Sequence, residues 1–234
     1  MQVRFERQRS GGVSVWKEPE PLKQYVIAAD AAGGGEHGDF AAACVIEAET
    51  CDLVATFRSK IDPHRFGPLA ARLAWYYGEA LLAFETYPSA HGYTAALEAQ
   101  HYGYKRLYRR HREDIGFRQI GDILGFHTNA TTKPQLIDRI KKALEEGCKI
   151  PSRDLMLEIK SKSWDETGDL SDRGHDDLLM AYAIALRVRD QAYTRGLLRE
   201  KAPELNSWED RYWAARRARF DRAQPRMRRA FNGL

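Results

Sequence analysis

The chain has 234 residues, of which 43% are hydrophobic, so it can bury the core of one large domain or of two small ones. No apolar run reaches the ~18 residues needed to cross a bilayer, which argues against a helical membrane protein. The first residues are charged and no hydrophobic stretch follows them, which argues against a signal peptide. Cys44, Cys51 and Cys148 show no metal-binding spacing and fit a reducing compartment.

The net charge of +4 is unevenly distributed along the chain. Residues 187–234 hold 13 Lys/Arg and 6 Asp/Glu, whereas the remaining residues hold 24 and 27. The C-terminal part is therefore basic and the rest slightly acidic. This asymmetry favours either a polyanionic partner or docking on an acidic protein, and the sequence does not separate the two.

Apolar patterns divide the chain into strands and helices. Residues 1–22 are charged and show no period, so we expect a linker or the remnant of an upstream segment there. Strands are predicted at residues 24–31, 40–48, 53–60 and 80–85. Helices are predicted at residues 62–80, 89–101, 133–147, 153–160, 176–189 and 206–222. Three antiparallel strands followed by a helix and a strand that pairs parallel with the first predict an α/β fold with a sheet of mixed direction.

Carboxylates stand at the ends of the predicted strands. Asp30 closes the first apolar run, and Glu85 closes the run at residues 80–85. If these strands are parallel neighbours, both side chains emerge at the same edge of the sheet, where sites form in open α/β folds. Asp39 begins the second strand, across a glycine-rich turn from Asp30.

A late helix brings two further acids. In the segment GHDDLLMAYAIAL, Asp177 shares a helical face with apolar residues four, seven and eleven positions later. That face must pack on the sheet, so Asp177 points inward at the start of the helix. Asp176 lies about 100° round the same helix.

Converging carboxylates of this kind repel one another unless a cation lies between them. Oxygen ligands suit Mg²⁺ or Mn²⁺ rather than Zn²⁺. Two such ions about 4 Å apart clamp the attacking and leaving oxygens of a phosphodiester during hydrolysis. Each acid alone is an ordinary turn former or helix cap. The coincidence of three such contexts favours a metal site.

The acids and their surroundings resemble the nuclease domain of the large terminase subunit of tailed bacteriophages. The residues that carry the resemblance are Asp30, Glu85 and the segments GHDDLLMAYAIAL and HTNATTKPQLIDRIKKALEEG, within about residues 25–189. The resemblance implies a ribonuclease H-like α/β fold, a mixed sheet flanked by helices. It would place a linker at residues 1–22, the nuclease domain at 23–190 and a basic helical tail at 191–234. The implied activity is endonucleolytic cutting of double-stranded DNA concatemers during genome packaging.

The resemblance also implies roles for single residues. Asp30, Glu85 and Asp177 match the core metal ligands, Asp176 the adjoining acid, and Asp39 a supporting one. His175 precedes the acid pair and either touches DNA or is an ordinary residue at a helix start. Lys133 either neutralises a phosphate or is an ordinary solvated lysine in a first helical turn.

Cofactors and partners follow from the same resemblance. Two Mg²⁺ or Mn²⁺ ions are expected in the active complex, with double-stranded DNA as substrate. A packaging ATPase, a portal and a small terminase subunit are the expected protein partners, in the host cytoplasm and away from any membrane. The chain contains no G-x-x-x-x-G-K-[ST] loop, so we expect no ATP site in it and a motor on another domain or polypeptide.

A basic stretch at residues 105–112 holds five cationic side chains, with Tyr104 directly before it and Tyr108 within it. We expect an exposed hairpin there that borders the metal cleft and grips the duplex. The alternative is a solvated sheet edge whose charge prevents aggregation. The predicted DNA-binding residues are Lys105, Arg106, Arg109, Arg110, Arg112, Lys133 and His175.

Two other functions stay open at this point. Another nuclease or a resolvase of the same fold would carry the same carboxylates. A catalytically silent module that binds DNA or docks a motor would carry the basic residues without needing the acids.

Overall fold

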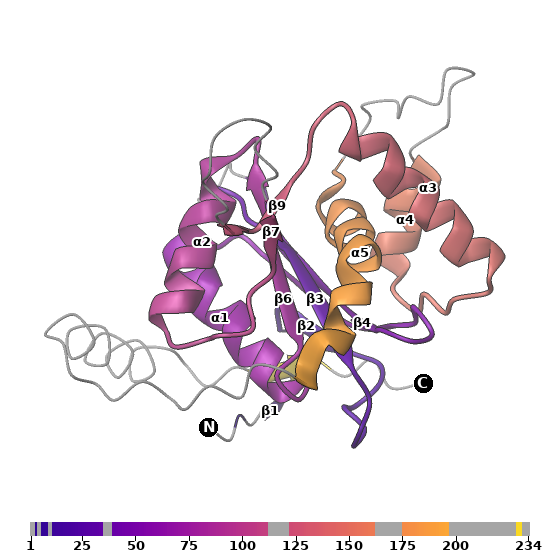
Figure 1. Ribbon diagram of the computed structural model, residues 1–234. Helices are drawn as coiled ribbons and strands as arrows, with labels where there is room; N and C mark the ends of the chain where they lie inside the picture. Colours follow the sequence, from indigo (N-terminus) through magenta and orange to yellow (C-terminus); the bar gives the residue numbers. More distant parts are fainter. Residues whose placement is uncertain are drawn as a thin grey trace, which may run out of the picture.

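A mixed sheet lies between two groups of helices, as Figure 1 shows. The computed structural model describes residues 3, 6–8, 11–34, 39–111, 122–161, 175–196 and 228–230. Helices α1 and α2 cover one face of the sheet, and α3, α4 and α5 lie over the other (Figure 1). The expected α/β architecture with a mixed central sheet is confirmed.

In the part of the chain that the structure describes, the main sheet has eight strands in the order β1-β10-β2-β5-β4-β3-β6-β9. β3 runs antiparallel to β4 and parallel to β6, as the sequence predicts, and β4 runs antiparallel to β5. A separate two-stranded sheet consists of β7 and β8. The strands are β1 (Glu6–Gln8), β2 (Val13–Val15), β3 (Tyr25–Asp30), β4 (Ala41–Glu47), β5 (Leu53–Ser59), β6 (Leu81–Tyr87), β7 (Arg109–His111), β8 (Asp122–Leu124), β9 (Phe126–His127) and β10 (Arg228–Ala230).

The helices agree with the predicted ones to within a few residues at each end. Side-chain caps begin α1 and α2: Asp62 accepts a hydrogen bond from the Arg65 amide, and Ser89 accepts one from the His91 amide. The helices are α1 (Pro63–Tyr76), α2 (Ala90–His101), α3 (Thr132–Glu145), α4 (Arg153–Ser161) and α5 (Asp177–Val188), followed by the 3₁₀ helix η1 (Arg189–Gly196).

The two faces of the sheet build two apolar cores. On β3, Ile27 and Ala29 belong to the core under α1 and α2, whereas Val26 and Ala28 belong to the core under α5. The small side chains let helices approach the central strands closely. At Gly92 this approach is extreme, because a β-carbon there would overlap the Glu85 carbonyl oxygen. The first turn of α2 is thereby pressed against the end of β6.

Both ends of the chain depart from the expected organisation. The expectation of irregular structure throughout residues 1–22 is wrong for β2, because Val13 and Val15 are 1% exposed and pair with β5. Three residues are too few for an alternating pattern to stand out in a sequence. Residues 228–230 form a strand instead of part of a helical tail. The helix predicted at 206–222 lies outside the described residues.

No helix in the described ranges combines the length and the apolar character that a membrane crossing requires.

Candidate active site

The strand register brings the predicted acids to one end of the sheet. Ala29 pairs with Phe84 across the parallel strands β3 and β6, so the next residues, Asp30 and Glu85, stand side by side where the strands end. Asp30 also pairs with Ala42, which packs in the core under α5. Since register neighbours point to the same face, Asp30 and Glu85 both face α5.

Asp177 lies at the same end of the sheet, at the start of helix α5. The start of α5 lies over β4, where the Cys44 Sγ donates to the Leu178 carbonyl at 3.4 Å. Asp177 is only 9% exposed, and its Oδ2 lies 3.8 Å from Arg58 Nη2 and 3.9 Å from His175 Nδ1. The structure therefore places its carboxylate on the sheet side of α5, as the helical period predicts.

The neighbouring acids fill out the group. Asp176 is the N-cap residue of α5, but its side chain does not cap the helix, so the ordinary explanation for an Asp at this place does not apply. Asp39 is exposed, at the start of the approach to β4. We call Asp30, Asp39, Glu85, Asp176 and Asp177 the acid cluster.

Mutual repulsion marks the acid cluster electrostatically. Burial raises the pKa of Asp30 well above its ordinary value, and the negative charges of Glu85, Asp177, Asp176 and Asp39 raise it further. Each predicted acid thus lies within electrostatic reach of Asp30. Burial likewise raises the pKa of Asp177, and the opposing positive charges of Arg58 and His175 do not cancel the effect.

The pKa of Glu85 is affected by Asp30 on β3 and by Thr128 and Lys133 near the start of α3. Burial raises its pKa, while Thr128 and Lys133 act in the opposite direction and a hydrogen bond with Asp30 also favours the ionised form. The Thr128 hydroxyl is buried and makes no hydrogen bond of good geometry, so its influence on Glu85 is one of proximity. Asp30 and Glu85 are close enough to share a proton when no cation separates them.

The acids do not form a finished coordination sphere. Among the residues that the structure describes, no three His, Cys, Asp or Glu side chains are grouped closely enough to hold an ion as they stand. Carboxylates that repel one another spread apart until a cation draws them together. The shared ion therefore stays a prediction, whereas the gathering of the acids at one sheet end is observed.

A polar rim borders Glu85 at the start of α3. The Asn129 side chain accepts hydrogen bonds from the amides of Thr131 and Thr132, both at 2.9 Å, and this turn sets the direction of the helix. Lys133, in the first turn, is exposed and lies within electrostatic reach of Glu85. The position of Lys133 is thus compatible with the predicted phosphate contact.

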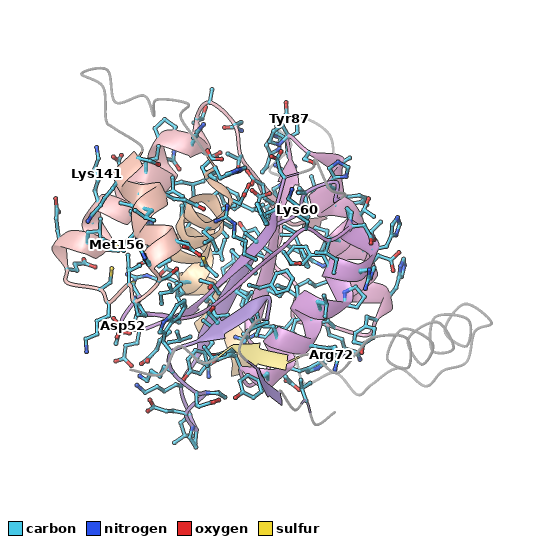
Figure 2. All side chains as sticks on the ribbon, turned by 180° about the vertical axis from the view of Figure 1, so that it is seen from behind. Asp52, Lys60, Arg72, Tyr87, Lys141 and Met156 are labelled. Carbon is cyan, nitrogen blue, oxygen red and sulfur yellow. The ribbon has the colours of Figure 1, made fainter. Side chains whose placement is uncertain are left out.

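An aromatic pair extends this rim. The ring centroids of Tyr87 and His127 lie 4.1 Å apart with the ring planes tilted by 35°, and Tyr87 is 49% exposed. Tyr87 follows Glu85 by two residues on β6 and projects from the end of the molecule (Figure 2). Sequence reasoning missed this pair, since two separated aromatic residues give no pattern.

The basic stretch at residues 105–112 is divided in the structure. Arg106 lies at the opposite end of β6 from Glu85, where its guanidinium donates to the carbonyls of Glu79 and Ala192. The expectation that the stretch begins beside the cleft is therefore wrong for Arg106, because the segment runs parallel to β6 and starts level with Leu82.

Arg109 and Arg110, later in the stretch, lie on different sides of the molecule. Arg109 donates to Gln100 of α2, on the face away from α5. Arg110 lies near His127 and helps to lower the pKa of that ring, after burial as the larger cause. Lys105 is exposed just before Arg106. The predicted hairpin exists as β7 and β8, and Arg112 lies outside the described residues.

Two further charged residues complete the site, and the sequence analysis missed both. Glu158 of α4 is 6% exposed and accepts a hydrogen bond from the Leu179 amide at 2.9 Å. Burial raises its pKa to about 7. Arg58 of β5 lies 3.5 Å from it. The detectable signal was a glutamate on the apolar face of an amphipathic helix, with Leu155 one turn before it.

Solved structures supply the comparison. The large terminase nuclease from thermophilic phage G20c matches with a TM-score of 0.54 and 20% identity, over 79% of this chain and 92% of that chain. The same nuclease with bound cobalt matches with a TM-score of 0.55 and 21% identity over the same shares. The Thermus phage P74-26 large terminase nuclease domain matches with a TM-score of 0.52 and 21% identity, over 80% and 90%.

Structures of the phage G20c nuclease with bound magnesium and with bound zinc also match. No known family model and no curated protein matches the sequence. The chain therefore has the α/β fold of the large terminase nuclease domains that it matches.

Proposed function

We propose that this chain is a metal-dependent endonuclease that hydrolyses phosphodiester bonds of double-stranded DNA and cuts genome concatemers during phage packaging. The observation that carries the proposal is the acid cluster, gathered from β3, β6 and the start of α5 at one sheet end. The fold of large terminase nucleases gives the cluster its context.

The residues present fit divalent ions. The cluster offers only carboxylate oxygens, which suit Mg²⁺ or Mn²⁺. Asp177 Oδ2 is buried and has no hydrogen-bond partner within the described ranges, although buried oxygens are normally satisfied. Asp30, Glu85 and Asp177 would hold the ions, with Asp176 and Asp39 in support. Bound there, a pair of ions supplies an activated water and stabilises the charge that develops on the phosphate.

The remaining residues act on the DNA. Lys133, beside Glu85, holds a phosphate near the reacting bond and adds positive charge where negative charge develops. Arg110 and the aromatic pair Tyr87–His127 lie along the same rim and position the strand by contacts with backbone and sugar. His175, 56% exposed beside Asp177, contacts DNA on the opposite side of the cluster.

The same proposal sets the chain in a packaging complex. The sequence has no phosphate-binding loop, so ATP hydrolysis belongs to another domain or polypeptide. A packaging ATPase, a portal and a small terminase subunit are the partners in this proposal.

The test is cleavage of supercoiled plasmid by the purified chain. Nicked and linear products are expected with Mn²⁺ or Mg²⁺ and none with EDTA. Asp30→Asn removes cleavage, whereas Asp138→Asn, which makes the same chemical change at an exposed position of α3, retains it. DNA binding without cleavage in either metal contradicts the proposal and identifies a silent binding module. Exclusive cutting of branched junctions identifies a resolvase instead.

A further inference from the structure

Arg58 holds an unusual position between two buried acids. Its register partner on β4 is Ala42, which pairs in turn with Asp30, so Arg58 lies in the same row of the sheet as the acid cluster. Its Nη1 is 3.5 Å from Glu158 Oε1, and its Nη2 is 3.8 Å from Asp177 Oδ2. The guanidinium lies over the Phe40 ring, with Cζ 4.5 Å from the ring centroid.

The ion pairs with Glu158 and Asp177 attract the Arg58 guanidinium but do not fix it by hydrogen bonds. Both distances exceed the range of a good hydrogen bond but lie within that of an ion pair. Arg58 Nε, Glu158 Oε1 and Asp177 Oδ2 are all buried, and none of them has a hydrogen-bond partner among the residues that the structure describes. A permanent structural pair looks different: Glu47, at the other end of the sheet, is bound by Lys17 and Lys23 at 2.8 and 2.7 Å.

Glu158 is the fixed member of the group. Its Oε2 accepts the Leu179 amide at 2.9 Å, which ties α4 to the first turn of α5. That leaves Oε1 for Arg58. The Arg58 guanidinium, which pairs with Glu158 and also lies near Asp177, therefore supplies positive charge beside Asp177 when no metal ion is bound.

We infer that Arg58 is a positioning residue that holds the place of a cation beside Asp177 until a divalent ion binds, and that Glu158 keeps Arg58 there. The inference rests on the proposed function, because it needs an ion at the acid cluster. Its consequence is that Arg58 stabilises the metal-free protein and weakens metal binding.

The test measures Mn²⁺ binding without DNA, by electron paramagnetic resonance of the free ion. The Kd of Arg58→Gln is expected to be about tenfold lower than that of the parent chain, the order expected when one like charge is removed close to a divalent ion under strong solvent screening. The melting temperature of the same variant in EDTA falls. Arg58→Lys keeps the charge and restores parent-like values for both. Arg58→Met, which keeps an apolar stem against Phe40, replaces the Gln variant if that one does not fold.

The outcomes separate the two proposals. If the parent chain binds no Mn²⁺, the proposed function and this inference both fail. If the parent binds Mn²⁺ and the uncharged Arg58 variants bind it equally or more weakly, only the inference fails, and Arg58 is a structural residue.

Glu158→Gln tests the second half of the inference. Loss of the negative charge at residue 158 frees Arg58 to pair with Asp177, so Mn²⁺ binding weakens. In the Arg58→Gln background there is no arginine to release, and the same change has a smaller effect. Equal effects in both backgrounds would show that Glu158 acts on the ion by its own charge and overturn its role through Arg58.

Discussion

Buried carboxylates stand at both ends of the central strands, and the two ends neutralise them differently. At one end Glu47, opposite Tyr25 in the register, is 1% exposed and receives hydrogen bonds from Lys17 and Lys23. Burial alone would raise its pKa, but the two lysines outweigh it and the pKa is lowered. At the other end Asp30 and Glu85 have raised pKa values among further acids.

The difference distinguishes a structural acid from a functional one. The chain supplies two ammonium groups to the single carboxylate of Glu47. For the acid cluster, the described residues supply Arg58 at 3.8 Å and His175 at 3.9 Å from Asp177 and, at longer range, Lys133 near Glu85. Figure 2 shows Tyr87, two residues after Glu85 on β6, well apart from Asp52, whose carbonyl accepts the Glu47 amide. Among the described residues, negative charge outweighs positive charge at one end only, as a site for external cations requires.

The largest expected contrast is in activity. Glu85→Gln and Asp177→Asn are each expected to lower plasmid cleavage by at least about a thousandfold, because an ion that stabilises the transition state by several kcal/mol loses a ligand. Glu47→Gln, at the other end, leaves the rate per folded molecule within about threefold, which corresponds to a barrier change of about 0.65 kcal/mol. Similar losses at both ends would remove the distinction.

The next contrast is in the sign of the stability change. In EDTA at neutral pH, Asp30→Asn is expected to raise the free energy of unfolding by about 1 kcal/mol, since it removes one of several repelling charges. Glu47→Gln lowers it by about 2 kcal/mol, a reduced value for a broken buried pair because Lys17 and Lys23 are each about one third exposed. Urea denaturation measures both, and changes of the same sign would contradict the comparison.

The pH dependence of stability sharpens the same contrast. A folded-state pKa raised above the unfolded value means that the native protein holds protons that the unfolded chain has lost, so stability falls as pH rises. For Glu158 the window runs from the ordinary glutamate pKa of 4.5 to the raised pKa of about 7. In EDTA, Glu158→Gln is expected to flatten the decline between these values. Denaturation from pH 5 to pH 8 measures it, and an unchanged slope in the variant would count against the assigned pKa.

The smallest expected effect concerns the divided basic stretch. Arg110→Gln is expected to reduce the salt slope of DNA binding by about one, the loss of one phosphate contact. Arg106→Gln leaves the slope unchanged but lowers stability by about 1 kcal/mol, because the Glu79 carbonyl loses its donor. Binding titrations at several salt concentrations measure the salt slope of each variant. A reduced slope for Arg106→Gln and an unchanged slope for Arg110→Gln would contradict the assignment of Arg110, and not Arg106, to the DNA contact.

The sequence predicted what depends on local patterns. Apolar runs ending in Asp30 and Glu85 located β3 and β6, and the helical period placed Asp177 on the inner face of α5. These features survive because each is set by alternation or by a 3.6-residue repeat. The metal-binding roles themselves are still predictions.

What the sequence did not predict depends on tertiary placement. Arg58 and Glu158 lie 100 positions apart in the numbering and meet only because α4 packs beside the start of α5. Arg106 is one residue in a cationic run, and only the parallel course along β6 shows that it starts at the far end. A charge run gives composition but no direction in space.

The most direct measurement is the anomalous scattering of Mn²⁺ in crystals of the chain soaked in that ion. The account predicts manganese peaks about 2 Å from carboxylate oxygens of Asp30 and of Glu85 or Asp177, with Arg58 drawn back from Asp177. Manganese bound elsewhere while these carboxylates stay free of metal would contradict the central claim that the acid cluster is an ion site.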